Sequence, residues 1–184
     1  MIFKPTPLAG AMIVEPEFRV DDRGGFARSY CAREFSAAGL EALVVQCNIS
    51  FNHQKGTLRG MHFQRPPASE SKLVRCTRGA IFDCIIDLRP ESQTYLKHFG
   101  LELTDRNHLA LFVPKGFAHG YLTLTDDTEI TYQVSEFYTP GLESGIRWND
   151  PLFGIEWPAE MLQISPKDAV WPDYQPEPPN TPHS

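Results

Sequence analysis

The sequence has no long apolar run, only four cysteines and no dense stretch of basic residues. No segment approaches the ~18 consecutive apolar residues of a membrane-spanning helix. Residues 1–18 contain prolines and glutamates where a signal peptide has an uninterrupted apolar run. We therefore expect no membrane partner and no signal peptide. The cysteines form no CxxC pair, which argues against a zinc ribbon and makes a reduced, cytoplasmic location the simpler expectation.

Charge is unevenly distributed along the chain, whose formal net charge is −6. Residues 1–89 hold 12 Lys and Arg against 9 Asp and Glu, whereas residues 90–184 hold 5 against 14. The basic stripe of a nucleic-acid-binding protein is missing, so we expect no nucleic-acid partner. A small anionic ligand needs only a few well-placed cations, and the first half of the chain supplies them.

The frequent prolines and glycines, together with alternating apolar and polar residues, indicate an all-β domain. The chain has 16 prolines and 13 glycines, which favour many short segments over long helices. Period-two alternation and turn residues predict a series of short strands at residues 72–77, 80–88, 109–113, 121–125 and 129–137. One short helix is expected at residues 32–40. This succession is typical of a β-sandwich or barrel.

The domain is expected to span residues 1–170, with a proline-rich tail at residues 171–184. The tail contains five prolines and offers little that could pack, so it is interpreted as extended or disordered. A lid over the functional site is the alternative.

Two histidines first suggest a metal site. The segment Pro114-x-Gly116-x-x-His119 resembles the second half of the metal-binding cupin signature. The first half requires a His-x-His pair, but here His62 is followed two residues later by Gln64. A firm transition-metal site needs at least three converging donors, so we expect neither a metal nor another cofactor.

The same polar residues suit proton transfer beside a ketone. Removal of such a proton requires a base with a pKa near neutrality, which His62 supplies, and Asp168 could orient it. The resulting enolate needs a cation or donor such as Lys72 or His119. Tyr132 could return a proton to the opposite face of the carbon. Spacing alone does not bring these groups together.

Several motifs, in order along residues 14–168, resemble those of the dTDP-4-dehydrorhamnose 3,5-epimerase family. The matching segments are residues 22–26, 46–50, 56–64, 72–74, 87–89, 113–120, 132–138, 148–151, 157–158 and 165–168. The resemblance implies a cupin-type jelly roll and a homodimer that exchanges N-terminal strands. It also implies a site without a metal that acts on a nucleoside-diphosphate 4-keto-6-deoxy sugar. The implied reaction converts dTDP-4-dehydro-6-deoxyglucose to dTDP-4-dehydrorhamnose.

The resemblance also assigns roles to individual residues. His62 corresponds to the base, Asp168 to its assistant and Tyr132 to the proton donor, while Lys72 and His119 lie beside the sugar and its keto oxygen. Tyr138 corresponds to an aromatic ring that stacks on the nucleobase. The positions that hold the nucleotide sugar are Arg23, Gln46, Asn48, Arg59, Glu143 and Lys167.

Arg28 departs from the family pattern, which usually has a glutamate there. A carboxylate suits the N3–H donor of thymine, whereas arginine suits an acceptor such as cytosine N3. A CDP-sugar substrate is therefore one interpretation, and contact of Arg28 with phosphate or solvent is the other.

The sequence leaves open whether C3, C5 or both carbons are inverted. A single-carbon epimerase, a metal-dependent cupin and a non-catalytic sugar-nucleotide binder remain the alternatives.

Overall fold

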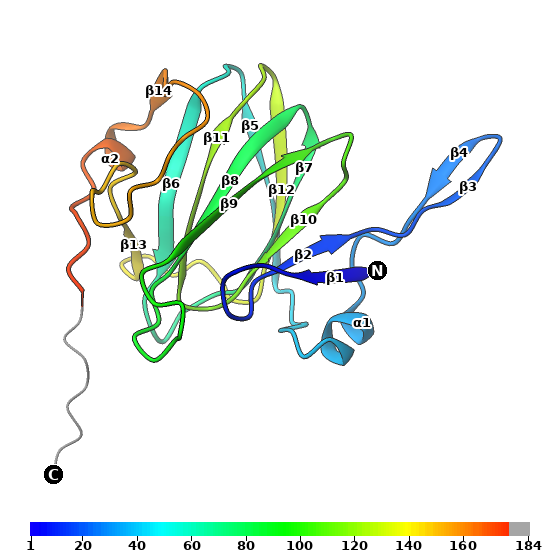
Figure 1. The fold of residues 1–184 in the computed structure, drawn as a ribbon, viewed down its shortest axis with the longest axis horizontal. Helices are drawn as coiled ribbons and strands as arrows, with labels where there is room; N and C mark the ends of the chain where they lie inside the picture. Colours follow the sequence, from blue (N-terminus) through cyan, green and yellow to red (C-terminus); the bar gives the residue numbers. More distant parts are fainter. Residues whose placement is uncertain (177–184) are drawn as a thin grey trace, which may run out of the picture.

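Two β-sheets packed face to face make up most of the molecule (Figure 1). The structure is a computed structural model and describes residues 1–176. In spatial order, the first sheet consists of β1 (Ile2–Pro5), β2 (Met12–Glu15), β10 (Ala110–Val113), β7 (Lys72–Arg78), β12 (Thr128–Val134) and β5 (Gln46–Asn52). The second consists of β13 (Glu143–Gly145), β6 (Thr57–Gln64), β11 (Phe117–Thr123), β8 (Ala80–Asp87) and β9 (His98–Thr104), with β14 (Gln163–Ile164) parallel to β6.

The remaining elements are small. A hairpin of β3 (Arg19–Asp21) and β4 (Gly24–Phe26) projects from the body, and two short helices, α1 (Ala32–Ala37) and α2 (Pro166–Ala169), flank the sheets (Figure 1). The architecture is a cupin-like jelly-roll β-sandwich, which confirms the all-β prediction. No helix in residues 1–176 is long and apolar enough to cross a membrane.

The predicted strands correspond to β7, β8, β10, the second half of β11, and β12. A tight connection at Gly79, which adopts a φ of 77°, joins β7 to β8. A turn that contains Asp126 and Asp127 joins β11 to β12.

The main core lies between the two sheets. Val74 and Ile130 from the first sheet pack with Ile85 and Leu103 from the second, and all four side chains are fully buried. Burial of an aliphatic side chain of this size stabilises the fold by about 1.5–3 kcal/mol. The alternation along each strand therefore determines which residues face the opposite sheet.

Helix α1 covers the outer face of the first sheet at one end. Its Phe35 packs against Ala110 and Phe112, whereas the alternate residues Leu111 and Val113 of the same strand enter the main core. Strand β10 is consequently buried on both faces, which explains its uninterrupted apolar sequence.

Strand β5, at the other edge of this sheet, has the reverse pattern. Its inward-facing residues are all polar, and its outward-facing Cys47, Ile49 and Phe51 are exposed. Nothing in residues 1–176 pairs with the outer edge of β5, which is the last strand of its sheet. A strand with a polar inner face lines a cleft rather than a core.

The beginning of the predicted tail differs from expectation. Arg147 forms an ion pair with Asp173, Tyr174 packs against Phe153, and Trp171 contacts α2, so residues 171–174 pack on the body. The prediction of an unpacked tail rested on its prolines and overlooked the aromatic rings and the carboxylate that make these contacts. The end of the predicted tail, residues 177–184, lies outside the described residues.

Candidate active site

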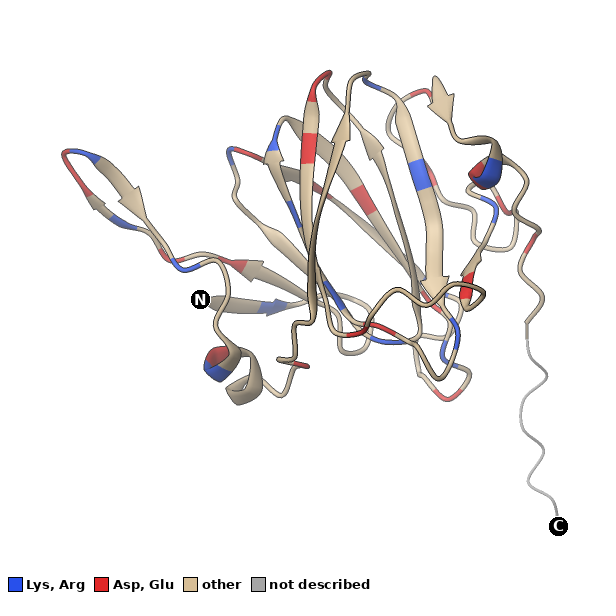
Figure 2. Ribbon diagram, turned by 180° about the vertical axis from the view of Figure 1, so that it is seen from behind, with Lys and Arg blue, Asp and Glu red and all other residues tan. Residues whose placement is uncertain are grey.

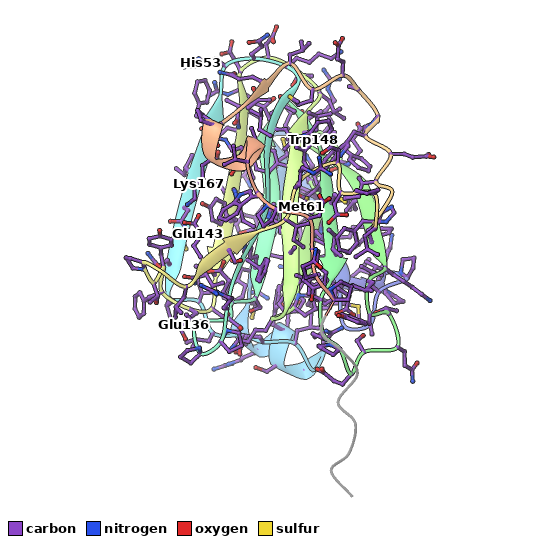
Figure 3. All side chains as sticks on the ribbon, turned by 90° about the vertical axis from the view of Figure 1, so that its left-hand side faces the viewer. His53, Met61, Glu136, Glu143, Trp148 and Lys167 are labelled. Atoms are coloured by element: carbon purple, nitrogen blue, oxygen red, sulfur yellow. The ribbon has the colours of Figure 1, made fainter. Side chains whose placement is uncertain are left out.

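A cleft of about 260 Å³ opens at the edge of the sandwich, where β5 of one sheet faces β6 of the other. Figure 3 looks toward this edge, with Lys167 on α2 and Glu143 on β13 beside it. Residues from five strands and two loops line the cleft: Gln46, Asn48, His62, Phe63, Gln64, Glu70, Lys72, Tyr132, Val134, Tyr138 and Glu143.

His62 and Asp168 form a dyad at this cleft. The Nε2 atom of His62 lies 2.6 Å from Oδ1 of Asp168, and the carboxylate is almost fully buried while the imidazole is one-third exposed. The buried carboxylate therefore fixes the ring, and the exposed side of the ring faces the cleft.

Helix α2 places Asp168 behind His62. Ser165 caps the helix by accepting a hydrogen bond from the Asp168 amide, and Pro166 occupies the first helical position. The Asp168 carboxylate also accepts hydrogen bonds from the Gly60 amide and the Trp171 indole. Burial raises the pKa of Asp168, but the contacts with His62 and these donors outweigh it and hold the pKa below its ordinary value. Asp168 is therefore a carboxylate at neutral pH.

Lys72 and Tyr132 approach the cleft from the first sheet, opposite His62. Lys72 begins β7 and is nearly buried, and its ammonium lies 3.2 Å from Glu70. Tyr132 lies on β12, and the residues two positions before and after it, Ile130 and Val134, are buried. Burial raises the pKa of Tyr132, the charge of Glu70 raises it further, and Arg59 opposes both.

A second imidazole–carboxylate pair lies beside the first. His119 on β11 is the register partner of His62 on β6, and its Nε2 lies 2.7 Å from Oδ1 of Asp83. Asp83 is fully buried, and its Oδ2 has no partner within residues 1–176. His119 itself is buried behind the cleft and does not line it.

Side chains at the rim of the cleft are connected to one another by hydrogen bonds and an ion pair. The Tyr138 hydroxyl donates to Glu143, which also pairs with Lys167, and Gln46 accepts a hydrogen bond from the Tyr138 amide. The ion pair with Lys167 lowers the pKa of Glu143. The exposed Tyr138 ring therefore has a fixed backbone and a tethered hydroxyl.

Arg59 also lies on β6, three residues before His62. Its Nε donates to Asn52 at 2.7 Å, and it lines an adjoining groove of about 430 Å³ rather than the cleft itself. Its effect on the pKa of Tyr132 shows that it acts electrostatically on the cleft.

Arg23 and Arg28 do not line the cleft within this chain, and their roles in holding the nucleotide stay predictions. Arg23 lies at the tip of the β3–β4 hairpin, where it pairs with Asp21 and is 90% exposed. Arg28 pairs with Glu34 of α1. The hairpin, which carries both signs of charge, extends away from the sandwich (Figure 2).

Two residues that contact this site were not anticipated from the sequence. Glu70 precedes β7, and its position two residues before Lys72 was the available signal. Trp171 was assigned to the tail, although a large aromatic side chain three residues after Asp168 is suited to pack near it. Trp171 also lies against β13, where a Cβ on Gly145 would come within 2.3 Å of the indole.

Gln64 occupies the position where the metal-binding signature has its second histidine. Its side-chain oxygen accepts from the Thr139 amide, and its side-chain nitrogen donates to Phe137, Ala68 and Glu70. Gln64 therefore ties loops together, and residues 1–176 contain no group of three or more His, Cys, Asp or Glu arranged to hold a metal ion. The expected independence from metals stays a prediction.

A His–Asp dyad, a lysine paired with Glu70 and a tyrosine surround one cleft, so the fold and the site define the class as a cupin-like protein with a polar cleft. Comparison with known proteins makes the assignment particular. The family model described as dTDP-4-dehydrorhamnose 3,5-epimerase matches residues 5–175. The chain belongs to this family of nucleotide-sugar epimerases, which confirms both the resemblance and the predicted enzyme class.

Individual relatives agree over nearly the whole chain. The dTDP-4-dehydrorhamnose 3,5-epimerase of Methanothermobacter thermautotrophicus is 46% identical over 172 residues, which is 92% of each chain. The crystal structure of the enzyme of that name from Bacillus anthracis, with TDP and PPi bound, superposes with a TM-score of 0.91 at 39% identity, covering 94% of this chain and 99% of that one. A dTDP-4-dehydrorhamnose 3-epimerase of Streptomyces niveus is 35% identical over 91% of this chain and 81% of its own.

Proposed function

We propose that the cleft epimerises a nucleoside-diphosphate 4-keto-6-deoxyhexose at C5 and C3, converting dTDP-4-dehydro-6-deoxyglucose to dTDP-4-dehydrorhamnose. One observation carries the mechanism: His62, held by Asp168, and Tyr132 approach one cleft from opposite sheets. Inversion requires a base on one face of the carbon and an acid on the other. Relatives named dTDP-4-dehydrorhamnose 3,5-epimerase support this substrate.

The proton transfers follow from this arrangement. His62 removes the proton beside the 4-keto group, and the C–H electron pair moves to the keto oxygen as an enolate. Lys72, which lines the cleft, stabilises that oxygen. His119 is paired with Asp83 behind the cleft and is given no part in this step. Tyr132 then donates its proton to the opposite face of the carbon while the enolate collapses to the ketone. The proton gained by His62 and the one lost by Tyr132 are exchanged with solvent.

The nucleotide is held at the rim and by Arg59. Tyr138 is exposed beside the cleft and can stack on a base, while Gln46, Asn48, Glu143 and Lys167 surround it with donors and acceptors. Arg59 offers a guanidinium to the diphosphate.

Arg28 is the residue that favours the second candidate, a CDP-sugar epimerase. Within the chain its guanidinium is occupied by Glu34, which reduces its availability for a base. Calorimetric comparison of dTDP and CDP binding tests this: tighter binding of CDP supports the second candidate, and tighter binding of dTDP supports the first.

A homodimer with exchanged N-terminal segments completes the proposal. The projecting hairpin carries exposed Val20 and Phe26 together with Arg23, and the outer face of β5 exposes Ile49 and Phe51. Apolar surfaces of this kind are covered in stable assemblies. A second copy would thereby bring Arg23, and Arg28 near it, to the cleft of its partner.

We also propose a cytoplasmic location for the enzyme. Cys31, Cys47, Cys76 and Cys84 form no disulfide with one another, and such free thiols persist in a reducing compartment.

Deuterium wash-in is the decisive measurement. Proton NMR in D2O with dTDP-4-keto-6-deoxyglucose is expected to show loss of signal at both C3 and C5. Exchange at C3 alone would assign a single-carbon activity like that named for the Streptomyces niveus relative. No exchange with either dTDP- or CDP-linked substrate would contradict an epimerase and favour a sugar-nucleotide binder.

A further inference from the structure

Glu70 is a carboxylate at the cleft that the proposed proton transfers do not use. It lies in the connection between β6 and β7 and lines the cleft with Lys72 and Tyr132, and its side chain is only 13% exposed. One carboxylate oxygen lies 3.2 Å from the Lys72 ammonium, and the other accepts a hydrogen bond of 3.0 Å from Gln64 Nε2. A buried charge in such a position needs both partners to be stable.

The surroundings of Glu70 specify a carboxylate. The orientation of the Gln64 amide is fixed, because its oxygen accepts from the Thr139 amide and its nitrogen also donates to the Phe137 carbonyl. Glu70 therefore faces an N–H donor on one side and an ammonium on the other. A glutamine at position 70 would turn its own NH2 group toward one of these donors.

Glu70 is the only ion-pair partner of the Lys72 ammonium within residues 1–176. A lysine head group this deeply buried is unfavourable without a counter-charge. The pairing leaves N–H groups of Lys72 free to face the cleft, where the keto oxygen of the substrate would lie.

Tyr132 responds to the same carboxylate. The negative charge of Glu70 is the second cause, after burial, of the raised pKa of Tyr132, and Arg59 acts in the opposite direction. The other titratable groups around this part of the sandwich are Lys72 on β7, His62 on β6, His119 and Tyr121 on β11 and Glu143 on β13. Strand β5 adds only the neutral amides Gln46 and Asn48.

We propose that Glu70 is a positioning residue of the active site: it fixes the Lys72 ammonium against the cleft and places a negative charge in the cleft that the Tyr132 phenol also lines. Its part in turnover rests on the proposed epimerase function, whereas its effect on Tyr132 does not. Loss of the Glu70 carboxylate would leave the Lys72 ammonium without its counter-charge in the cleft that Tyr132 also lines.

Ultraviolet titration of the tyrosinate tests the proposal without substrate, with Tyr132→Phe subtracted to isolate the Tyr132 signal. Glu70→Gln is expected to lower the pKa of Tyr132, because the negative charge that raises it is removed while Arg59 still lowers it. Lys72→Met is expected to raise it, and the double variant is expected to return it toward the wild-type value. Glu102→Gln, the same change at an exposed position on β9, is the matched control and should leave the titration unchanged.

Turnover provides the second readout. The alkaline limb of the kcat/KM profile should move to lower pH in Glu70→Gln together with the Tyr132 titration. Glu70→Asp keeps the charge but shortens the side chain, so it should leave the titration near the wild-type value while kcat falls about tenfold.

An unchanged Tyr132 titration in folded Glu70→Gln would overturn the proposal. If that variant does not fold, Lys72→Met decides, since an unchanged or lowered pKa of Tyr132 there would also overturn it. A wild-type enzyme without deuterium exchange would refute the epimerase function instead, and the titration would still report on Glu70.

Discussion

The orientation of His62 depends on one side chain, the Asp168 carboxylate. Replacement by asparagine keeps the size of the group but removes the charge and offers a donor on one side, so the imidazole can take the wrong tautomer. We expect Asp168→Asn to slow deuterium wash-in by about 10²–10⁴-fold. Nucleotide affinity, measured by calorimetry with dTDP, should change little, since Asp168 lies behind His62 and does not line the cleft.

The control for this variant is Asp126→Asn, which alters a carboxylate in the turn between β11 and β12. Its exchange rate should match that of the wild type. Loss of dTDP binding in Asp168→Asn, rather than loss of exchange, would mean that Asp168 holds the rim together instead of orienting the base.

At the scale of elements, the connection after β8 is anchored by a buried carboxylate. Asp87 accepts hydrogen bonds from Arg89, Ser92 and Thr94. Burial raises the pKa of Asp87, but these hydrogen bonds outweigh it and hold the pKa below its ordinary value.

Asp87→Asn should therefore destabilise the fold by about 2 kcal/mol at pH 7, measured by urea unfolding. Because the folded-state pKa is lowered, this stabilisation is complete above the unfolded-state pKa of about 4 and is lost as the pH falls through the folded value. The difference between variant and wild type should shrink below about pH 4. A difference that is constant with pH would show that packing, not the charge, is responsible.

The contact between β13 and the segment after α2 provides a second test at this scale. A methyl group on Gly145 would collide with the Trp171 ring, which donates a hydrogen bond to Asp168. We expect Gly145→Ala to cost about 1–3 kcal/mol of stability and to lower the exchange rate. Ser144→Ala, one residue earlier on the same strand, should do neither. Full activity in Gly145→Ala would mean that Trp171 is not needed to hold Asp168.

The sequence predicted those elements whose alternation is set by the core alone. β7, β8 and β12 each place one face in the inter-sheet core, so period-two patterns identified them. β5 was not predicted as a strand, because its polar face lines a cleft and its apolar face is exposed. The dyad was anticipated as a pair of residue types, but only the register of β6 and the cap of α2 bring His62 and Asp168 within 2.6 Å. Glu70 and Trp171 were missed since their roles depend on neighbours distant in the sequence.

At the scale of the whole molecule, the proposed exchange of N-terminal segments predicts complementation between two inactive variants. Arg23→Ala removes the cation on the hairpin, and His62→Asn removes the base. If each cleft uses Arg23 of the other copy, a mixed dimer has one site with both groups intact. Co-refolding equal amounts should restore about one quarter of wild-type activity, since half of the dimers are mixed and each has one complete site.

Either variant refolded alone is the control and should remain inactive or strongly impaired. Restoration should depend on refolding together, because exchanged segments do not separate on simple mixing. Absence of any restored activity, with a dimer present by sedimentation, would show that Arg23 does not act on the partner cleft.

Strand β5 has a consequence for how this protein can change over time. Its polar residues face the substrate cleft while its alternate residues present Ile49 and Phe51 on the outside. Insertion or deletion of one residue within the strand would exchange the two faces along the remaining length. Such a change would make the lining of the cleft apolar and the outer surface polar at the same time. Point substitutions can adjust either face separately, so β5 can diversify by replacement but not by changes in length, unlike the loops on either side of it.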